Sequence, residues 1–353
     1  MMATHSEFDH TTSAFKVATA FPLSIKGRVF LITGVSLGGI GGATAKAIAS
    51  QSPKLLILTG RTNEKVDAVI SEIQSAFPKV ACRFLQLDLS FQSSVRKAAS
   101  EVLAYEELID VLINNAGVAT VIERTLSEDG IEVQFATNHV GHFLFTNLIM
   151  PKLITAAKAS STDSVRIINL SSNGHRYSPV RFSDINWEKT KDEIPADEWP
   201  DYEFLKARVT VPTSQPYIPM AAYGASKTAN ILFTVSLDQR LKSLGIRSLA
   251  VHPGVINTEL MRHMSREDAE ATLKRLADSW KTLEQGASTT LVAALDPGSL
   301  CKGEKFYMSD CQFADAKAWA SDLNTAEKLW AMSEDLVGEK FGVPGISESE
   351  VDG

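Results

Sequence analysis

The amino-acid sequence predicts an α/β fold, a single domain built on a doubly wound parallel sheet with helices on both faces. Short apolar runs alternate with segments of helical periodicity from Lys26 onward, which is typical of right-handed βαβ units. The runs are apolar almost throughout, as expected for strands buried on both faces of a parallel sheet. A glycine-rich stretch also separates the first apolar run from the first helical segment.

Each element is predicted from its local pattern. The predicted strands are Val29–Ile32, Leu55–Leu58, Phe84–Leu87, Val111–Ile113, Val165–Ile168 and Ser248–Val251. Predicted helices include the Ala-rich stretch Ala43–Ala49, the segment Glu64–Phe77, the pattern from Tyr223 to Leu241, and Ala314–Val337 over the core or at a subunit interface. Because ligands of such sheets bind outside the carboxyl ends of the strands, functional residues are expected just after each apolar run.

The domain is expected to cover residues 26–341. Residues 1–25 contain Glu7, Asp9 and His10 without an apolar core, so they predict a flexible N-terminal extension rather than a signal peptide. Residues 342–353 are expected to form a tail. The segment 175–220 has no clean period but many prolines and aromatic residues, which indicates an irregular packed insertion, a flap near the active site.

The composition indicates which kinds of binding partner the protein has. A formal net charge of −7 without clustered Lys and Arg argues against nucleic acid. Cys82, Cys301 and Cys311 are too few for a disulfide framework and lack metal-ligand spacing, which favours reduced cysteines, no metal site and a cytoplasmic location. No apolar run has the length of a membrane span. A small-molecule substrate is the partner that remains.

The glycine-rich loop runs from Thr33 to Gly42, between the first strand and the first helix. Glycine lets the backbone turn sharply and approach a pyrophosphate, and the helix start offers amides to the anion. Dinucleotide binding by Gly34, Ser36, Gly39 and Ile40 is therefore predicted over an ordinary turn.

Two residues after later strands bear on the choice of cofactor. Arg61 follows the second strand, at the place where an enzyme that prefers NAD usually has an acidic residue against the ribose hydroxyls. A guanidinium there favours NADP by pairing with the 2′-phosphate, although NAD and a solvated surface arginine remain alternatives. Asp88 follows the third strand and is expected either to accept a hydrogen bond from the adenine or to cap the next helix.

Tyr223 and Lys227 are spaced so that they lie on one face of a helix. A phenol with a pKa near ~10 is a poor base at neutral pH. A cation about 4 Å away contributes at most roughly 4 kcal/mol at an effective dielectric near 20, which would bring the phenolate within reach of acid–base work. The pair therefore predicts a catalytic tyrosine assisted by a lysine.

Further polar residues end neighbouring strands. Ser172 follows the predicted strand at Val165 and is placed to hydrogen-bond a carbonyl or alkoxide oxygen beside Tyr223. Asn115 lies in Asn114–Gly117 after another strand, where side-chain amides tie neighbouring loops together beside the cofactor. Each piece alone could be a cap or a turn, but together they indicate an active site at one edge of the sheet.

These motifs resemble the short-chain dehydrogenase/reductase family. The resemblance covers roughly Lys26 to Asp310 and rests on the glycine loop, Asn114–Gly117, Thr137–Phe143, Ser172, the Tyr223/Lys227 pair and His252-Pro253-Gly254. The stretches Thr137–Leu144, Ile185–Trp187 and Tyr223–Phe233 look most like the retinol-dehydrogenase-like and WW-domain-oxidoreductase-like branch.

The resemblance implies a Rossmann-type oxidoreductase that transfers hydride between NADP, or NAD, and an alcohol or carbonyl substrate. It implies a catalytic tetrad of Asn138, Ser172, Tyr223 and Lys227, in which Lys227 also holds the nicotinamide ribose and Asn138 seats a water of the proton relay. Val255 and Thr258 are expected against the nicotinamide, and a homodimer is expected at the level of the family.

Two departures from the family pattern leave questions open. Four residues separate Gly34 from Gly39 where the family has three, so either Gly38 or Gly39 meets the pyrophosphate. The interval from Ser172 to Tyr223 is long and places the flap between two catalytic residues. The alternatives to an enzyme on apolar substrates are a catalytically silent dinucleotide-binding regulator and, less favoured, an epimerase or dehydratase.

Overall fold

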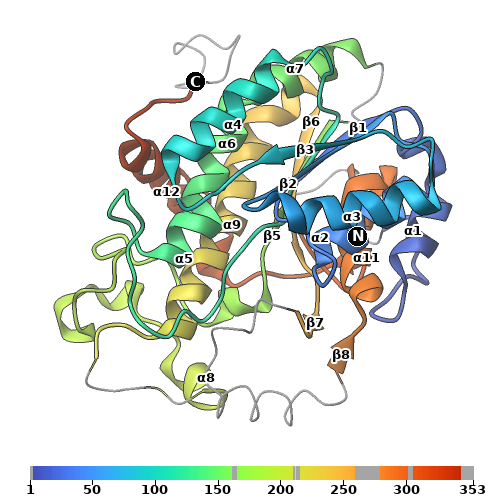
Figure 1. The fold of residues 1–353 in the computed structure, drawn as a ribbon. Helices are drawn as coiled ribbons and strands as arrows, with labels where there is room; N and C mark the ends of the chain where they lie inside the picture. Colours follow the sequence, from blue (N-terminus) through green and yellow to red (C-terminus); the bar gives the residue numbers. More distant parts are fainter. Residues whose placement is uncertain are drawn as a thin grey trace.

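The computed structural model describes residues 3–160, 165–209, 211, 215–258, 279–300 and 305–342. In this part of the chain a sheet of eight strands has the order β10-β9-β6-β5-β4-β1-β2-β3 (Figure 1). All its pairs are parallel except β9 with β10. The order reverses between β1 and β4, which creates the crevice where such sheets bind ligands. The predicted doubly wound parallel sheet is confirmed.

The strands form where the apolar runs predict them, with ends that differ by a few residues. The central strands β1, β4 and β5 are buried along their whole length, which explains why their sequences are apolar rather than alternating. The strands of the sheet are β1 (Val29–Ile32), β2 (Leu55–Gly60), β3 (Cys82–Gln86), β4 (Val111–Asn114), β5 (Val165–Leu170), β6 (Ile246–His252), β9 (Tyr307–Ser309) and β10 (Gln312–Phe313). A separate parallel pair joins β7 (Val255–Ile256) to β8 (Trp280–Lys281).

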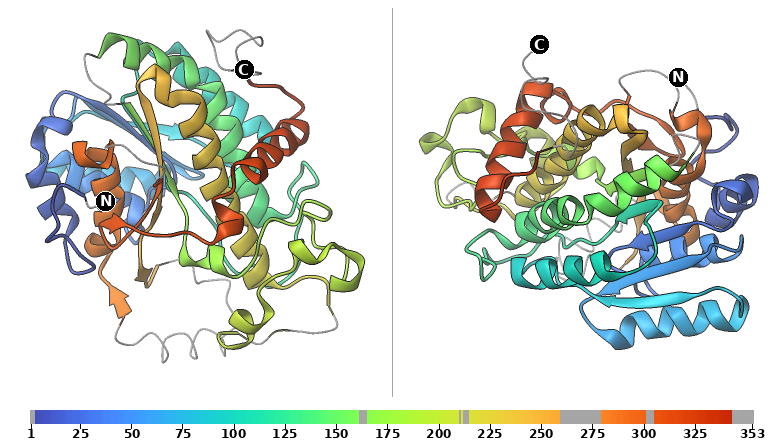
Figure 2. Two further views of the ribbon diagram at one scale, coloured as in Figure 1. Left: turned by 180° about the vertical axis from the view of Figure 1, so that it is seen from behind. Right: turned by 90° about the horizontal axis from the view of Figure 1, so that it is seen from above.

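Helices cover both faces of the sheet, and each face has its own apolar core (Figure 2). One face is covered by α4 (Gln92–Ala104), α6 (Gly141–Leu148), α7 (Met150–Ala159), α9 (Pro219–Leu241) and α12 (Leu323–Val337). The other is covered by α1 (Ala14–Ala20), α2 (Ile40–Ala49), α3 (Asn63–Ala76) and α11 (Leu283–Leu295). The helix α9 is buried along most of its length, so it forms the wall against which the site is built.

The N-terminal segment corrects one expectation. Residues 3–25 are not a flexible extension in the structure, because α1 packs against α2 and α11 and buries Ala14, Val17 and Ala18. The side chain of Gln312 donates to the carbonyl of Phe8 at 2.8 Å and holds the preceding loop. The partners of this segment lie far along the chain, so its local sequence carried no sign of them.

Phe8 is the anchor of this segment, since its side chain is 2% exposed and stacks on His5 with ring centroids 4.5 Å apart. Replacing Phe8 with Ala is expected to lower the free energy of unfolding by about 3 kcal/mol, through lost burial and a cavity. Urea unfolding measures the change, with Leu23→Ala as the control because Leu23 is 87% exposed. Equal stability of the two variants would mean that the segment is not docked in solution.

The insertion is irregular, as predicted, and is packed. It contains η3 (Asn173–Arg176), η4 (Lys191–Glu193), η5 (Ala196–Glu198) and the short helix α8 (Tyr202–Lys206). Trp187, Leu205 and Tyr217 bury their side chains against the first turns of α9. The insertion therefore lies on the end of α9 that carries Tyr223.

A π-helical turn, η2 (Ala136–Val140), lies between α5 (Val133–Phe135) and α6 and holds Asn138. Such turns carry one extra residue within a helix and occur often at functional sites. In the described part of the chain, no single helix is long and apolar enough to span a bilayer. Only the bent pair Val133–Leu148 and Met150–Ala159, at 53° to each other, meets both criteria when taken together.

Candidate active site

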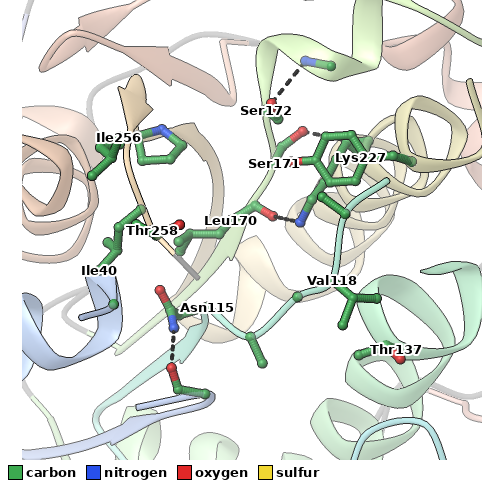
Figure 3. Close-up of a pocket in the computed structure, with 18 of the residues that line it drawn as sticks. Ile40, Asn115, Val118, Thr137, Leu170, Ser171, Ser172, Lys227, Ile256 and Thr258 are labelled. Carbon is green, nitrogen blue, oxygen red and sulfur yellow. Dashed lines mark hydrogen bonds between the residues drawn. The ribbon is translucent and has the colours of Figure 1, made fainter. Parts of the chain in front are cut away.

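A cavity of about 1170 Å³ follows the carboxyl edge of the sheet. Every residue predicted to bind cofactor or to act in catalysis lines it, except Asn138. These lining residues are Gly34, Ser36, Gly39, Ile40, Arg61, Asp88, Asn115, Ser172, Tyr223, Lys227, Val255 and Thr258. In Figure 3, Ile40, Ile256 and Thr258 lie on one side of the cavity, and Val118 and Thr137 lie on the other.

The glycine loop packs tightly against the segment that follows β4. Gly34 has a φ of +69°, and a Cβ atom there would lie 2.6 Å from the Cα of Ala116. Gly39 is the N-cap of α2 and makes no side-chain capping bond, so the first turn of this helix is left uncapped toward the cavity. The extra residue of the loop is accommodated by a turn in which the Gly39 amide donates to Ser36 O at 3.2 Å. This geometry suits a pyrophosphate.

Gly34 offers a sharp test of the loop. Gly34→Ala is expected to weaken dinucleotide binding by more than about tenfold, since the added methyl group meets backbone and the positive φ is strained. Gly130→Ala is the matched control, because Gly130 also has a positive φ, of +76°, but lies outside the cavity lining, and a Cβ atom there meets nothing within 4 Å. Fluorescence titration of NADPH measures both variants, and equal affinity would show that the loop adjusts freely.

Arg61 and Asp88 lie after β2 and β3 as predicted. Arg61 is exposed at the cavity, and its backbone carbonyl accepts a bond from Gln86 Nε2 at 3.5 Å. The carboxylate of Asp88 accepts bonds from the amide and hydroxyl of Ser90, at 3.0 and 2.6 Å. It therefore forms a local turn and does not act as the N-cap of α4, which is Phe91.

Asn115 ties neighbouring loops together, as predicted, whereas Asn114 links neighbouring strands. Asn115 Nδ2 donates to the carbonyls of Thr33 and Gly34 at 2.7 and 2.9 Å, which fastens the glycine loop to the end of β4 (Figure 3). Asn114 Nδ2 donates to Asn169 Oδ1 at 2.8 Å, inside the sheet. The Asn115 side chain thus shapes the cofactor side of the cavity from within.

Tyr223 and Ser172 lie beside each other in the cavity lining, within hydrogen-bond contact. Gly174 makes this possible, because a Cβ atom at position 174 would lie 2.8 Å from the Tyr223 ring. Ser172 Oγ accepts the Gly174 amide at 2.9 Å, which leaves its own proton to donate elsewhere. The neighbouring Ser171 instead donates to the Lys227 carbonyl at 2.7 Å. Ser172 is therefore the serine whose hydroxyl is available to a substrate oxygen.

Lys227 lies one helical turn from Tyr223 on α9. Its Nζ atom donates to Leu170 O at 3.0 Å and lies 5.7 Å from the centroid of the Tyr223 ring (Figure 3). Its side chain is buried and reaches the cavity floor. The predicted pairing on one helix face is therefore present, with the ammonium group held by the end of β5.

Burial, rather than the pairing of Tyr223 with Lys227, dominates the pKa of both residues in this structure. Burial raises the pKa of Tyr223 to about 12, and a hydrogen bond with Ser172 opposes that rise. Burial also lowers the pKa of Lys227 to about 7. Both residues are nearly shut off from water, and the loss of hydration is the largest cause of both shifts. Tyr223 is consequently protonated at neutral pH, as a proton donor must be.

Asn138 is buried and is not among the residues that line the cavity. Its Oδ1 atom accepts the Val118 amide at 2.8 Å, and its Nδ2 group donates to Val118 O and to Ser226 Oγ, both at 2.9 Å. Ser226 adjoins Lys227 on α9, so Asn138 joins the π-helical turn to the helix that carries both Tyr223 and Lys227. Both donors of the Asn138 side chain are therefore used within the protein.

The histidines have structural roles. Thr33 Oγ1 accepts the amides of Asn115 and Ala116 and therefore donates to His142 Nε2, at 2.8 Å. His142 Nδ1 then donates to Asn138 O at 3.0 Å, which links the cofactor loop to the π-helical turn. His139 and His175 are also buried in hydrogen bonds, the latter to Ser172 O at 2.7 Å. Structural hydrogen bonding for His139 and His142 is confirmed.

Several residues of the site were not predicted. Tyr307 on β9 donates to Asn173 Oδ1 at 3.2 Å, and His252 Nδ1 accepts the Asn173 amide at 3.2 Å. The insertion adds Arg176, Tyr177, Phe204 and Arg208 to the cavity wall. No period marks these positions, although their cluster of aromatic residues was visible. The sequence around Met261 and Met264 suits the wall of an apolar substrate pocket, but these residues lie outside those that the structure describes. Within the described residues, no group of three or more His, Cys, Asp and Glu side chains is placed to hold a metal ion.

Comparison with known proteins places this geometry in a family. The sequence profile for short chain dehydrogenase matches residues 28–183 and 209–269. Oxidoreductase fscI of Fusarium equiseti is 41% identical over 251 residues, which cover 70% of this chain and 94% of that protein. Retinol dehydrogenase 11 of Homo sapiens is 35% identical over 317 residues, covering 90% of this chain and 87% of that protein.

Among solved structures, an uncharacterized protein from Mycobacterium Paratuberculosis is similar over 92% of this chain and 98% of its own, with a TM-score of 0.65 and 30% identity. The family match contains the glycine loop, Ser172 and the Tyr223/Lys227 pair. The chain therefore belongs to the short-chain dehydrogenase family, on its retinol-dehydrogenase-like branch, and is a nicotinamide-dependent oxidoreductase.

Proposed function

We propose that this oxidoreductase uses NADP(H) to interconvert a carbonyl compound with an apolar body and its alcohol. The observation that carries the proposal is the buried Tyr223 hydroxyl beside Ser172 at the floor of a large cavity. A protonated phenol next to a second hydroxyl is suited to hold a carbonyl oxygen and to give it a proton.

The residues of the loop fit a dinucleotide. Gly34 lets the backbone approach closely, and Gly39 and Ile40 begin a helix whose first amides face the cavity. Val255 and Thr258 would lie against the nicotinamide, and Lys227 against its ribose. The bound cofactor supplies the hydride.

The chain's own residues handle the oxygen and its proton. Ser172 Oγ, oriented by the Gly174 amide, donates to the substrate oxygen. Tyr223 donates a second hydrogen bond and transfers its proton as the alkoxide forms. Lys227, in its protonated form, stabilises the phenolate that remains, and the reverse sequence oxidises the alcohol.

Arg61 supports NADP, because an exposed guanidinium after β2 is placed for a 2′-phosphate. Arg61→Ala is expected to lower kcat/KM with NADPH by about tenfold, the value of one charge-assisted contact, and to leave kcat/KM with NADH unchanged. Parallel assays with both cofactors measure the ratio. A proportional loss with both cofactors would remove Arg61 from the choice between them.

The function is tested by following NADPH absorbance with the full chain and a panel of apolar aldehydes and ketones. Consumption that depends on a carbonyl substrate is expected. NADPH binding without consumption across the panel would favour the alternative, a dinucleotide-binding regulator. A fluorescence titration run beside the assay separates binding from turnover.

A further inference from the structure

Ser172 is held through both of its oxygen atoms by the turn η3 that follows it. The Gly174 amide donates to the side-chain Oγ at 2.9 Å. The Ser172 carbonyl accepts two bonds from His175, one from the backbone amide at 3.0 Å and one from ring Nδ1 at 2.7 Å. His175 therefore fixes the backbone of the residue whose hydroxyl is to orient the substrate oxygen, a role that rests on the proposed function.

The hydrogen bonds of His175 determine its tautomer. A carbonyl oxygen only accepts, so the Nδ1 atom that contacts Ser172 O carries the proton. A backbone amide only donates, so Nε2 accepts the Lys317 amide, at 3.2 Å, and carries no proton. Burial favours the same neutral ring, because it lowers the pKa of His175 to about 4. His175 is consequently a fixed donor at neutral pH and not an acid–base group.

The segment after β10 holds His175 in this orientation. Lys317 engages the second ring nitrogen, and Trp319 Nε1 donates to the His175 carbonyl at 3.1 Å. Tyr307 on β9 meets the imidazole ring edge-on, with ring centroids 5.2 Å apart. All three residues lie beyond residue 269, where the match to the family profile ends. A part of the chain outside that match therefore supports the turn that carries Ser172.

We propose that His175 is a positioning residue, which keeps the Ser172 hydroxyl at the place where it meets the substrate oxygen. The segment with Lys317 and Trp319 contributes to catalysis in turn, because it holds the imidazole ring. His175 itself is 0% exposed and is not among the described residues that line the cavity, so it acts through Ser172 and not on the substrate. A misplacement of about 1 Å in an orienting group is enough to cost on the order of 10²-fold in rate.

The first test replaces His175 with Leu or with Asn. Leu has neither nitrogen, whereas the side-chain amide of Asn supplies a donor near the position of Nδ1. With the full chain, NADPH and benzaldehyde, His175→Leu is expected to lower kcat by about 10²-fold and to leave KM for NADPH within about twofold. His175→Asn is expected to recover about tenfold of that loss, the value of one hydrogen bond. Equal losses in the two variants would overturn the proposal.

His10→Asn is the control for these variants, because His10 is exposed and lies outside the cavity lining. Its kcat is expected to stay within about twofold of the original. A loss as large as that of His175→Leu would mean that the assay responds to any histidine exchange, and the proposal would fall.

A double-variant cycle separates positioning of Ser172 from general support of the fold. In Ser172→Ala the hydroxyl that His175 positions is absent, so adding His175→Leu is expected to change kcat by less than about threefold. Single turnovers with enzyme in excess over NADPH measure these slow rates. A further loss of about 10²-fold in the Ser172→Ala background would mean that His175 acts independently of the serine, which contradicts the proposal.

The Lys317 amide can be removed without touching η3. Lys317 has a φ of −63°, which proline adopts, so Lys317→Pro deletes the N–H group that His175 Nε2 accepts. Lys317→Ala is the matched variant, since it keeps that N–H group and loses only the side chain, which pairs with Asp201. The kcat of the Pro variant is expected to be about tenfold below that of the Ala variant. Equal values would remove the segment after β10 from the proposal.

A measurement without turnover keeps this inference separate from the proposed function. Asn173-Gly174 is the only Asn-Gly pair in the sequence, so isotope labelling of the asparagine carbonyl and the glycine nitrogen gives a single NMR signal for the Gly174 amide. Because this amide donates to Ser172 Oγ, its hydrogen exchange is expected to be about tenfold faster in His175→Leu and close to the original in His175→Asn.

The two readouts fail in different ways. If no carbonyl compound consumes NADPH but exchange at Gly174 responds as expected, the proposed function fails and the positioning by His175 stands. Unchanged exchange in His175→Leu overturns the positioning by His175, whatever the rate of turnover.

Discussion

Replacing Tyr223 with Phe is expected to lower kcat for carbonyl reduction by about 10³-fold, within the range that general acid catalysis supplies. The variant removes one oxygen atom and keeps the ring that packs against Gly174. The neighbouring Ser172 hydroxyl does not replace it, because an aliphatic alcohol is a far weaker acid than a phenol, whose pKa is ~10. Steady-state assays with saturating NADPH measure the loss.

The Tyr223 ring is part of the cavity wall, and the Phe variant keeps it. The affinity for NADPH is therefore expected to stay within about twofold of the original, since the variant changes neither the charge nor the shape of the cofactor site. Ser171→Ala is the control variant, as the Ser171 hydroxyl bonds only the Lys227 carbonyl among the described residues. Turnover by Tyr223→Phe at the original rate would show that the proton comes from another group.

Replacing Lys227 with Met is expected to give an enzyme that is slower and more stable. Loss of the cation that stabilises the phenolate lowers kcat by about 10²-fold. The stability gain arises because burial lowers the pKa of Lys227 to about 7, against ~10.4 in an unfolded chain. The folded state thus carries a cost for this amine, and Met fills a similar volume without it.

The stability gained by Lys227→Met is expected to depend on pH. Below about pH 7 the amine is charged in both states, so the folded protein bears the whole cost of burying the charge. As pH rises from about 7 toward ~10, the unfolded chain binds more protons than the folded one, and the cost disappears. Lys227→Met is therefore expected to gain on the order of 2 kcal/mol at neutral pH and little near pH ~10.

Urea unfolding of both proteins at the two pH values checks this. A gain that is equal at both values would mean that packing, not charge, is responsible. A loss of stability at neutral pH would contradict the buried position of the amine. Lys46→Met is the control, because Lys46 lies on the surface beside Glu72.

The sequence predicted those parts of the molecule that depend on neighbouring residues. The strands are buried on both faces, so apolar runs such as Leu55–Leu58 mark them directly. The parallel order then brings the residues after each strand to one edge, which is why Ser172 and Tyr223 meet in space although the insertion separates them. The spacing of Tyr223 and Lys227 gave their shared helix face.

The features that were not predicted depend on contacts with residues far along the chain or on how deeply a group is buried. The docking of Phe8 relies on Gln312, far along the chain. The pKa of Tyr223 is set by burial, which a helical spacing does not reveal. The contacts of the Asn138 side chain with Val118 and Ser226 were not predicted either, because the π-helical turn sets them.

That turn also makes the length of its segment critical. Each residue of an α-helix advances the side-chain direction by about 100°. A π-helical turn is a local insertion of one residue into such a helix. Deleting one residue within Ala136–Val140 would restore a regular helix and rotate either Asn138 or the whole of α6 out of phase. If α6 rotates, His142 loses its contact with Thr33 and Phe143 leaves the core; if Asn138 rotates, its contacts with Val118 and Ser226 are lost. We therefore expect this short stretch to tolerate exchanged side chains better than an added or deleted residue.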